Sequence, residues 1–330
     1  MNIGLTYDLK TDYSLKKGES EDTLAEFDPP ETIKDLEEAL IGLGHKVIKI
    51  GRAEKLLKAL NKLSVDMVFN LAEGNYGRNR ESWVPVILEL KKIPFLGSDA
   101  SILGICLDKL LTKKLLVANG ISTPDFRGID SLDNLKKLTL KFPIIVKPRY
   151  EGSSKGISVK SIVKNKKELI SRVKFILNKY KQPALVEEFI KGSEFTVAII
   201  GNNHPEVMPI VPRAVDMDTT LSTHVLDKDT TRVRSSKIKE ATEITPELEK
   251  NLKHLALKTY QVLDCFDFAR IDFRVDERNN PFVLEVNPLP NLSKDDSFGL
   301  LAEYLNISYK DLINKILKAG IKRLGINEKR

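Results

Sequence analysis

Apolar residues in the first hundred positions recur at two spacings that alternate along the chain. Short apolar runs predict strands at Asn2–Thr6, Lys46–Ile50, Asp66–Asn70 and Pro94–Leu96. Apolar residues at helical spacing predict helices at Pro30–Leu43, Ala53–Leu63 and Glu81–Lys91. Strands that alternate with helices form a parallel sheet with helices on both faces. We therefore expect residues 1–105 to form a doubly wound α/β unit.

The middle of the chain, residues 106–191, is predicted to form a smaller α+β unit. Its expected elements are a helical segment over Asp99–Ala118, strands at Pro143–Lys147, Ile157–Ile162 and Ala184–Glu187, and a helix at Lys166–Tyr180. Residues 192–330 form the third expected unit, with mixed strands from Phe195 onward and a long polar loop at Asp216–Lys239. A helix is expected to begin near Thr245, where a threonine N-cap precedes a proline.

Two runs with period-two alternation, joined by a polar turn, predict a β-hairpin in the third unit. One face of the first run is expected to carry Ile271, Phe273 and Val275, and its other face Arg270, Asp272 and Arg274. In the second run the apolar face is expected to carry Phe282, Leu284 and Val286, with Glu285 and Asn287 opposite. Antiparallel pairing across this turn places Asp272 directly opposite Glu285, about 5 Å away.

Two opposed carboxylates repel each other, so this hairpin predicts a cation between them. Asp272, Glu285 and Asn287 supply hard oxygen donors, which suit Mg²⁺. Arg270, on the same face, is placed to stabilise a developing oxyanion or to neutralise the carboxylates. The alternative from these residues alone is an ordinary hairpin whose polar face carries cross-paired arginine and glutamate.

A second candidate site lies around Lys147, at the end of a predicted strand, and the loop Glu151–Gly156. Glycines let backbone N–H groups approach phosphate oxygens, serines add donors and lysine adds charge. Neither a Walker A loop nor the G-x-G-x-x-G dinucleotide motif occurs. The strand that ends near Glu187 could hold an adenine on its backbone. The alternative for the loop Glu151–Gly156 is a plain flexible turn, and the alternative for the strand near Glu187 is a strand followed by a solvated acidic turn.

Composition narrows the class of protein further. The 330 residues are 42% hydrophobic, and no apolar run approaches the roughly 18 residues that cross a bilayer. Only Cys106 and Cys265 occur, both in apolar segments, which is typical of a reducing cytoplasm. The net charge is +7, but the lysines are spread along amphipathic helices without interleaved aromatic residues. We therefore expect a cytoplasmic protein with no membrane and no nucleic-acid partner.

Taken in order, the segments from Gly97 to the C-terminus resemble the ATP-grasp superfamily, and most closely the D-alanine–D-alanine ligases. The matching segments are Asp108-Lys109 with Lys113, Gly120-Ile-Ser-Thr-Pro124, Phe142 to Lys147, Glu151-Gly-Ser-Ser154, Glu187 to Val197, Ala269-Arg-Ile-Asp272 and Leu284-Glu-Val-Asn287. The resemblance implies a three-lobed ATP-grasp fold, with a Rossmann-like domain at 1–105, a small ATP-binding lobe at 106–191 and a C-terminal lobe at 192–330.

The resemblance also implies a role for each matching residue. Lys109 and Lys147 would contact ATP phosphates, and Ser153 and Ser154 would lie in the loop that closes over them, with Ser153 close to the reacting groups. For the nucleoside it implies an adenine edge at Glu187, Phe189 and Ile190, and a ribose contact at Glu194. For the chemistry it implies Mg²⁺ or Mn²⁺ on Asp272, Glu285 and Asn287, and Arg270 as the group that stabilises a tetrahedral intermediate.

The implied activity is an ATP-dependent ligation of a carboxylate to an amine through an acyl phosphate, with release of ADP and phosphate. The best single prediction is D-alanyl-D-alanine, a peptidoglycan precursor. The alternatives are a ligase for other amino acids or small carboxylates and, in another class, a nucleotide-binding regulatory protein without catalysis. Assembly as a homodimer is compatible with the resemblance.

The chain departs from the family where substrates are held. The glutamate of the family's early glycine-rich loop has no counterpart in Gly4 to Thr11, so Glu73 is predicted to bind the substrate ammonium instead, with Arg78 or Arg80 for a carboxylate. The alternative for Glu73 is a solvated turn residue. Two further substrate contacts are predicted at Ser297 and Lys228.

Overall fold

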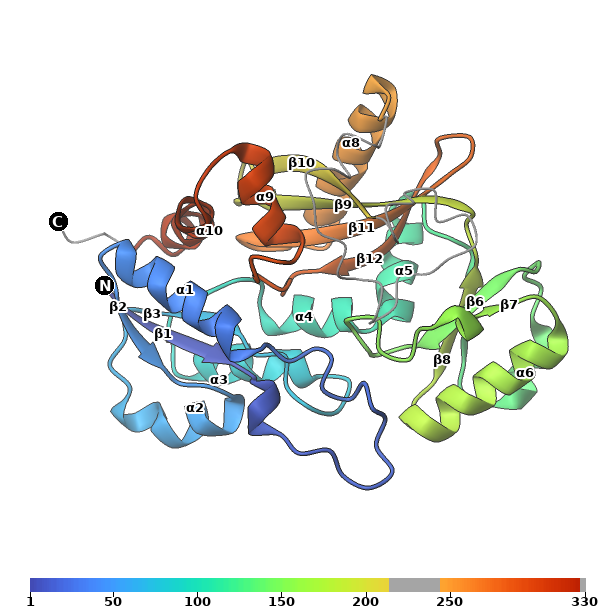
Figure 1. The fold of residues 1–330 in the computed structure, drawn as a ribbon, viewed down its shortest axis with the longest axis horizontal. Coiled ribbons are helices and arrows are strands. Elements are labelled where there is room, and N and C mark those ends of the chain that lie inside the picture. The colour runs from blue at the N-terminus through green and yellow to red at the C-terminus, as the bar shows by residue number, and fades with distance from the viewer. Residues whose placement is uncertain (214–243, 327–330) are drawn as a thin grey trace.

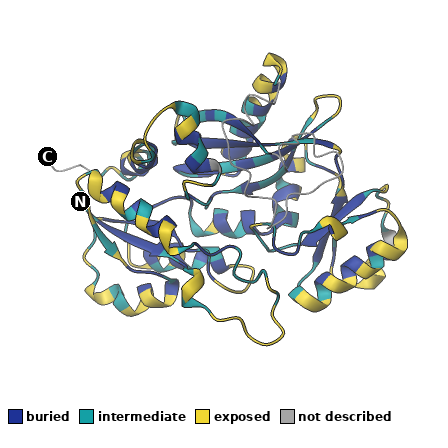
Figure 2. Ribbon diagram, in the orientation of Figure 1, coloured by how far each residue is buried: buried dark blue, intermediate teal, exposed yellow. Residues whose placement is uncertain are grey.

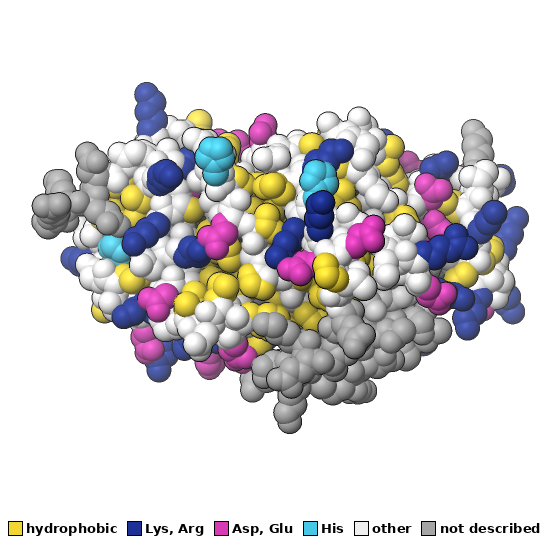
Figure 3. Space-filling view, turned by 90° about the horizontal axis from the view of Figure 1, so that it is seen from above, with side chains coloured by type: hydrophobic (Ala, Val, Ile, Leu, Met, Phe, Trp, Pro, Cys, Tyr) yellow, Lys and Arg dark blue, Asp and Glu magenta, His cyan; other side chains and the backbone are white. Residues whose placement is uncertain are grey.

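The computed structural model describes residues 1–213 and 244–326 of the chain, and they contain three four-stranded sheets (Figure 1). The predicted loop Asp216–Lys239, with Lys228, lies outside the described residues. In the described part of the chain no helix is long and apolar enough to cross a membrane. On the face shown in Figure 3, lysines and arginines are scattered among acidic and apolar side chains and form no continuous basic band.

The N-terminal sheet has the strand order β2-β1-β3-β4, and every pair is parallel. Alternate residues of its strands point to opposite faces, so Leu5 and Phe69 pack with α1 and α10, whereas Val68 packs with α2 and α3. The predicted doubly wound unit is therefore confirmed. Its elements are β1 (Asn2–Tyr7), α1 (Pro30–Gly42), β2 (Lys46–Lys49), α2 (Ala53–Ala59), β3 (Met67–Leu71), α3 (Trp83–Leu90) and β4 (Phe95–Leu96).

Two helices then connect this sheet to the next, where the sequence pattern predicts one helical segment. The break occurs at Asp108, whose ψ of 88° is not helical and whose carboxylate caps the second helix by accepting from Leu111 N at 3.2 Å. Arg149 holds the same carboxylate with two bonds of 2.6 Å. The break makes Lys109 the first residue of the second helix. The helices are α4 (Ala100–Leu107) and α5 (Lys109–Ala118).

The central sheet is antiparallel, in the order β5-β8-β6-β7, and α6 covers its apolar face. The predicted strand Ile157–Ile162 is wrong, because a short 3₁₀ turn occupies Val159–Ser161 and only Ile162–Val163 pairs. Side chains of Ser158 and Ser161 satisfy the backbone of that turn in place of a neighbouring strand. The elements are β5 (Phe126–Ile129), β6 (Ile144–Pro148), β7 (Ile162–Val163), α6 (Lys166–Phe175, extended by a π-helical turn Ile176–Tyr180) and β8 (Ala184–Glu188).

The C-terminal sheet is antiparallel in the order β10-β9-β11-β12, with α8 packed on one face. Thr245 caps α8 by accepting from Leu248 N at 3.2 Å, which confirms the predicted start of that helix. The elements are β9 (Gly192–Ile200), β10 (Glu206–Arg213), α8 (Pro246–Val262), β11 (Phe268–Asp276), β12 (Pro281–Asn287), α9 (Ser297–Leu305) and α10 (Tyr309–Leu324).

The hairpin β11–β12 has the predicted register at its functional end, where Asp272 pairs with Glu285. A β-bulge follows, so Phe273 pairs with Val283 and Leu284 has no opposite residue. Because of the extra residue, Phe282 and Val283 change sides relative to a regular strand. The buried side of β12 therefore carries Val283 and Val286. The predicted apolar face with Phe282 and Leu284 is therefore wrong, and Leu284 lines the central cavity instead.

Each sheet lies within one of the three units predicted from the sequence, but the helices at the C-terminus do not stay with the third. α10 packs against α1 and completes the core of the N-terminal sheet, whose strands are coloured as buried in Figure 2. The boundaries at 105 and 191 stay a prediction.

Candidate active site

One cavity of about 780 Å³ is lined by strands of the central and C-terminal sheets and by segments that follow strands of the N-terminal sheet. It brings together most of the residues singled out by the sequence pattern, from elements far apart along the chain. Its lining includes the predicted residues Glu73, Lys109, Lys147, Ser153, Ser154, Glu187, Phe189, Ile190, Glu194, Arg270, Asp272, Glu285 and Asn287. Ser297 begins α9 directly after Asp295 and Asp296, which line the cavity, but its side chain is not described.

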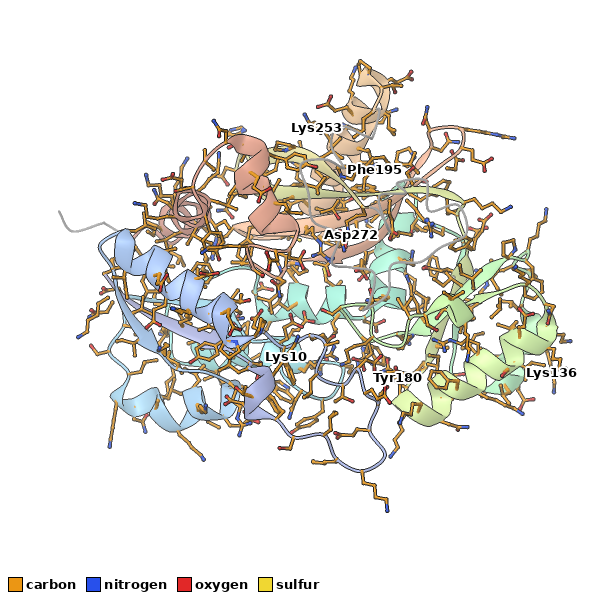
Figure 4. All side chains as sticks on the ribbon, in the orientation of Figure 1. Lys10, Lys136, Tyr180, Phe195, Lys253 and Asp272 are labelled. Carbon is orange, nitrogen blue, oxygen red and sulfur yellow. The ribbon has the colours of Figure 1, made fainter. Side chains whose placement is uncertain are left out.

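The Asp272–Glu285 pair lies on the cavity face of the C-terminal sheet, near the middle of the molecule in Figure 4. Asp272 accepts from Thr196 Oγ1 at 2.7 Å and from Arg270 Nε at 3.0 Å. Glu285 lies 3.1 Å from Lys109 Nζ. Burial alone would raise the pKa of Glu285, but Lys109 and other nearby cations hold it well below its usual range. Glu285 is therefore ionised, and both carboxylates line the cavity.

These residues fit a divalent cation. Asn287 donates its Nδ2 to Asp272 at 3.1 Å, which leaves its carbonyl oxygen available as a third oxygen donor next to the carboxylates. A set of two carboxylates and one amide oxygen suits Mg²⁺, which keeps positions for phosphate oxygens and water. Lys109 contacts Glu285 and Arg270 contacts Asp272, so each of the opposed carboxylates also has a cationic side chain beside it.

A buried cluster of two lysines and one glutamate lies at the side of the cavity formed by β6 and β8. Lys147 and Lys113 both contact Glu187, with Lys113 Nζ at 2.9 Å, and all three side chains are almost fully buried. Burial lowers the pKa of Lys113 to about 8. Two cations share one carboxylate, so this cluster retains one positive charge. Lys113 belongs to the matched motif, but only the fold shows that it supports Glu187.

The loop Glu151–Gly156 carries the second group of phosphate-binding candidates. Ser153 and Ser154 both have left-handed backbone conformations, with φ of 45° and 57°. The residues lie in a turn, and backbone N–H groups in turns can form anion-binding concavities. Lys155 anchors the loop through Glu26, 3.0 Å away, and through Glu151. The serines are thus held at the cavity by a buried ion-pair network.

Glu26 is the main site residue that sequence reasoning missed. It lies in the segment before α1, is 3% exposed, and accepts from Gly152 N of the serine loop and from Arg80 Nη2 at 2.7 Å. The segment after β1 therefore does bring a glutamate to the loop. Arg80 is buried in this network, Arg78 lies 3.5 Å from Asp108, and neither arginine lines the cavity, so their role with a substrate carboxylate stays a prediction. The sequence signal was a glutamate just before the first helix.

Glu73 lies where the pattern places it, just beyond the carboxyl end of β3 and on the cavity wall. Burial raises its pKa well above the usual range, and the nearby carboxylates Glu26, Glu81 and Asp28 raise it further. Such a group gains stability when a cation binds beside it, because the cation compensates both burial and repulsion. The position therefore suits an ammonium group better than solvent.

An apolar end of the cavity lies between the central and C-terminal sheets. Ile145, Ile157 and Phe189 pack together on one side, and Leu284 of the β-bulge lines the other. Glu194 lies beside them on β9. A flat base fits such an apolar slot, and a neighbouring carboxylate can accept hydrogen bonds from sugar hydroxyls.

Comparisons with known proteins agree with this geometry. Residues 115–318 match the family model described as the C-terminus of D-Ala–D-Ala ligase. The chain is 34% identical over 301 residues to the D-alanine–D-alanine ligase of Carboxydothermus hydrogenoformans, covering 86% of this chain and 90% of that one. It is 36% identical to the uncharacterized protein y4sG of Sinorhizobium fredii, with 86% of each chain covered. The crystal structure of the Bacillus anthracis D-alanine–D-alanine ligase complexed with ATP superposes with a TM-score of 0.74, at 25% identity and 98% coverage of both chains.

The fold is therefore the ATP-grasp fold, and the protein is an ATP-dependent ligase that forms C–N bonds. The chain belongs to the D-alanine–D-alanine ligase family. These matches confirm the fold class and the activity predicted from the sequence. The roles of individual residues stay predictions.

Proposed function

We propose that this ligase joins two small amino acids, with D-alanine as the first choice for both, and uses ATP with Mg²⁺. The observation that carries the proposal is the opposed pair Asp272 and Glu285, which shares the cavity wall with Lys109 and Arg270. In this arrangement two carboxylates can hold a cation while two side-chain cations remain for phosphate and for a developing oxyanion. Relatives named D-alanine–D-alanine ligase support the choice of substrate.

In the first step a carboxylate oxygen of the first amino acid attacks the γ-phosphorus of ATP, and ADP leaves. Lys109, Lys147 and the backbone of the serine loop bind the phosphates and orient the γ-phosphoryl group toward the carboxylate. A magnesium ion held by Asp272, Glu285 and Asn287 would neutralise charge on the phosphate oxygens. The product of this step is an acyl phosphate, and the cavity walls keep water away from it.

In the second step the uncharged amine of the second amino acid attacks the acyl carbon. The tetrahedral intermediate carries negative charge on its former carbonyl oxygen, and Arg270 stabilises that oxyanion. The attacking nitrogen loses one proton to the departing phosphate, and collapse of the intermediate breaks the bond from carbon to the phosphate oxygen and leaves the amide bond. The protein contributes position and charge to both steps rather than a covalent intermediate of its own.

The proposal is tested by ADP release with a panel of D- and L-amino acids, supplied singly and in pairs, with Mg²⁺ present. We expect release that depends on an amino acid, fastest with D-alanine, and a dipeptide whose mass is the sum of its components less water. Fast ADP release with a different pair of amino acids would change the proposed substrates but would still support an amino-acid ligase. No release with any pair would contradict the amino-acid substrate class.

Glu73→Gln is expected to raise the KM for the first amino acid at least tenfold, with little change in the KM for ATP. The substitution keeps the shape of the side chain but removes the charge that would pair with the ammonium, a loss of about 1.4 kcal/mol or more. Steady-state kinetics with each substrate varied in turn measures both constants. Glu54→Gln, an exposed change in the same domain, is the control. An unchanged amino-acid KM would place the ammonium elsewhere.

A further inference from the structure

A row of three charged residues crosses the cavity face of the C-terminal sheet beside the apolar slot. Glu194 on β9 is paired in register with Arg213 on β10 and with Arg274 on β11. All three line the cavity. Neighbouring side chains on the same face of paired strands lie about 5 Å apart, so Glu194 has an arginine beside it on each adjacent strand. Motif comparison had singled out Glu194 but not the arginines.

The carboxylate of Glu194 has an oxygen that accepts no hydrogen bond from the part of the chain that the structure describes. Its Oε2 atom is buried and has no hydrogen-bond partner among the described residues. A buried acceptor without a partner costs free energy, and a ligand that donates to it recovers that cost. Burial raises the pKa of Glu194, and Arg274 and Arg213 oppose this rise. The ionised form, the better acceptor, therefore depends on the arginines.

Arg274 is fixed on its other side by an aromatic ring. Its guanidinium carbon lies 4.4 Å from the centre of the Phe189 ring, and the residue is only 4% exposed. This contact holds the guanidinium over the ring that lines the slot, on the strand next to Glu194. Arg213 has a different partner, since its Nη1 atom lies 3.9 Å from Oδ1 of Asp296. The two arginines are therefore positioned by separate contacts.

We propose that Arg274 is a positioning residue for ribose recognition, which keeps the Glu194 carboxylate aimed at the sugar hydroxyls of the nucleotide. The inference rests on the proposed use of this cavity for ATP. The phenyl ring of Phe189 sets the position of Arg274, Arg274 sets the position and charge of Glu194, and Glu194 accepts from the ribose. The enzyme thereby distinguishes a ribonucleotide from its deoxy analogues.

The test compares the binding of two nucleotides to the wild-type protein and to Arg274→Met, with Mg²⁺ and without amino acids, by calorimetry. Methionine keeps an apolar contact with Phe189 but removes the charge. We expect the Kd for ATP to rise about tenfold, since hydrogen bonds to a charged group are the strong ones. The Kd for 2′,3′-dideoxy-ATP should change less than twofold, because this nucleotide has no hydroxyl for Glu194.

Two further variants separate this role from a merely structural one. Arg274→Lys should retain most of the preference for ATP, and Arg274→Met made in a Glu194→Gln background should add no further loss. An equal loss of affinity for both nucleotides, or an additive loss in the double variant, would overturn the inference and assign Arg274 to the base or to folding. If the wild-type protein bound neither nucleotide, the proposed function itself would fail.

Discussion

Glu285→Gln is expected to lower the turnover number by about two to three orders of magnitude while the fold stays intact. Glutamine keeps the size of the side chain and one oxygen, but it removes the charge that pairs with Lys109 and faces Asp272. The cation site would lose half of its carboxylate charge, so the phosphates would be held less firmly in the transition state. ADP release at saturating ATP and Mg²⁺ measures the effect.

The matched control is Glu277→Gln, the same change at an exposed position in the turn of the same hairpin. It should leave turnover within about twofold of the wild type, as surface changes usually do. Circular dichroism and thermal unfolding should show both variants folded. Near-wild-type ADP release by a folded Glu285→Gln protein would remove this residue from the metal site.

Arg270→Met is expected to lower kcat by about two to three orders of magnitude and to change the Kd for ATP far less. Arg270 donates to Asp272 from Nε at 3.0 Å and from Nη2 at 2.9 Å, which fixes its guanidinium beside the reacting groups. Charge on the oxyanion develops only in the transition state, so the loss falls on the rate and not on ground-state binding. Single-turnover kinetics and calorimetry with ATP measure the two quantities.

Arg278→Met, in the exposed turn of the same hairpin, is the control for this change and should behave as the wild type. A comparable loss of ATP affinity in Arg270→Met would assign Arg270 to nucleotide binding. A kcat within threefold of the wild type would mean that another donor stabilises the oxyanion.

The β11–β12 hairpin shows which features of a structure the local sequence pattern can predict and which it cannot. Period-two alternation and the length of one turn were enough to place Asp272 opposite Glu285, because both residues lie on adjacent strands within a short stretch of chain. The same reasoning could not find the bulge at Leu284, since a bulge is favoured by what packs on each face of the sheet. That bulge decides which apolar side chain enters the cavity.

The prediction of a strand at Ile157–Ile162 is wrong for a related reason. Its β-branched residues favour extended backbone, but serine side chains bond the local backbone, and no partner strand is available along most of its length. The helical segment Asp99–Ala118 was predicted as a whole, yet Asp108 divides it, because the bidentate contact with Arg149 across 41 residues holds the cap.

The sequence by itself determined the order of the elements, the family, and the residue types that can bind phosphate and a divalent cation. These depend on periodicity and on motifs within short stretches, where chain connectivity leaves few alternatives. Only the tertiary structure decided that Glu26 accepts a hydrogen bond from Gly152, 126 residues away, and that Arg80 forms a buried ion pair with the same glutamate. The same holds for Arg274 between Phe189 and Glu194, because contacts between separate elements depend on how three sheets pack around one cavity.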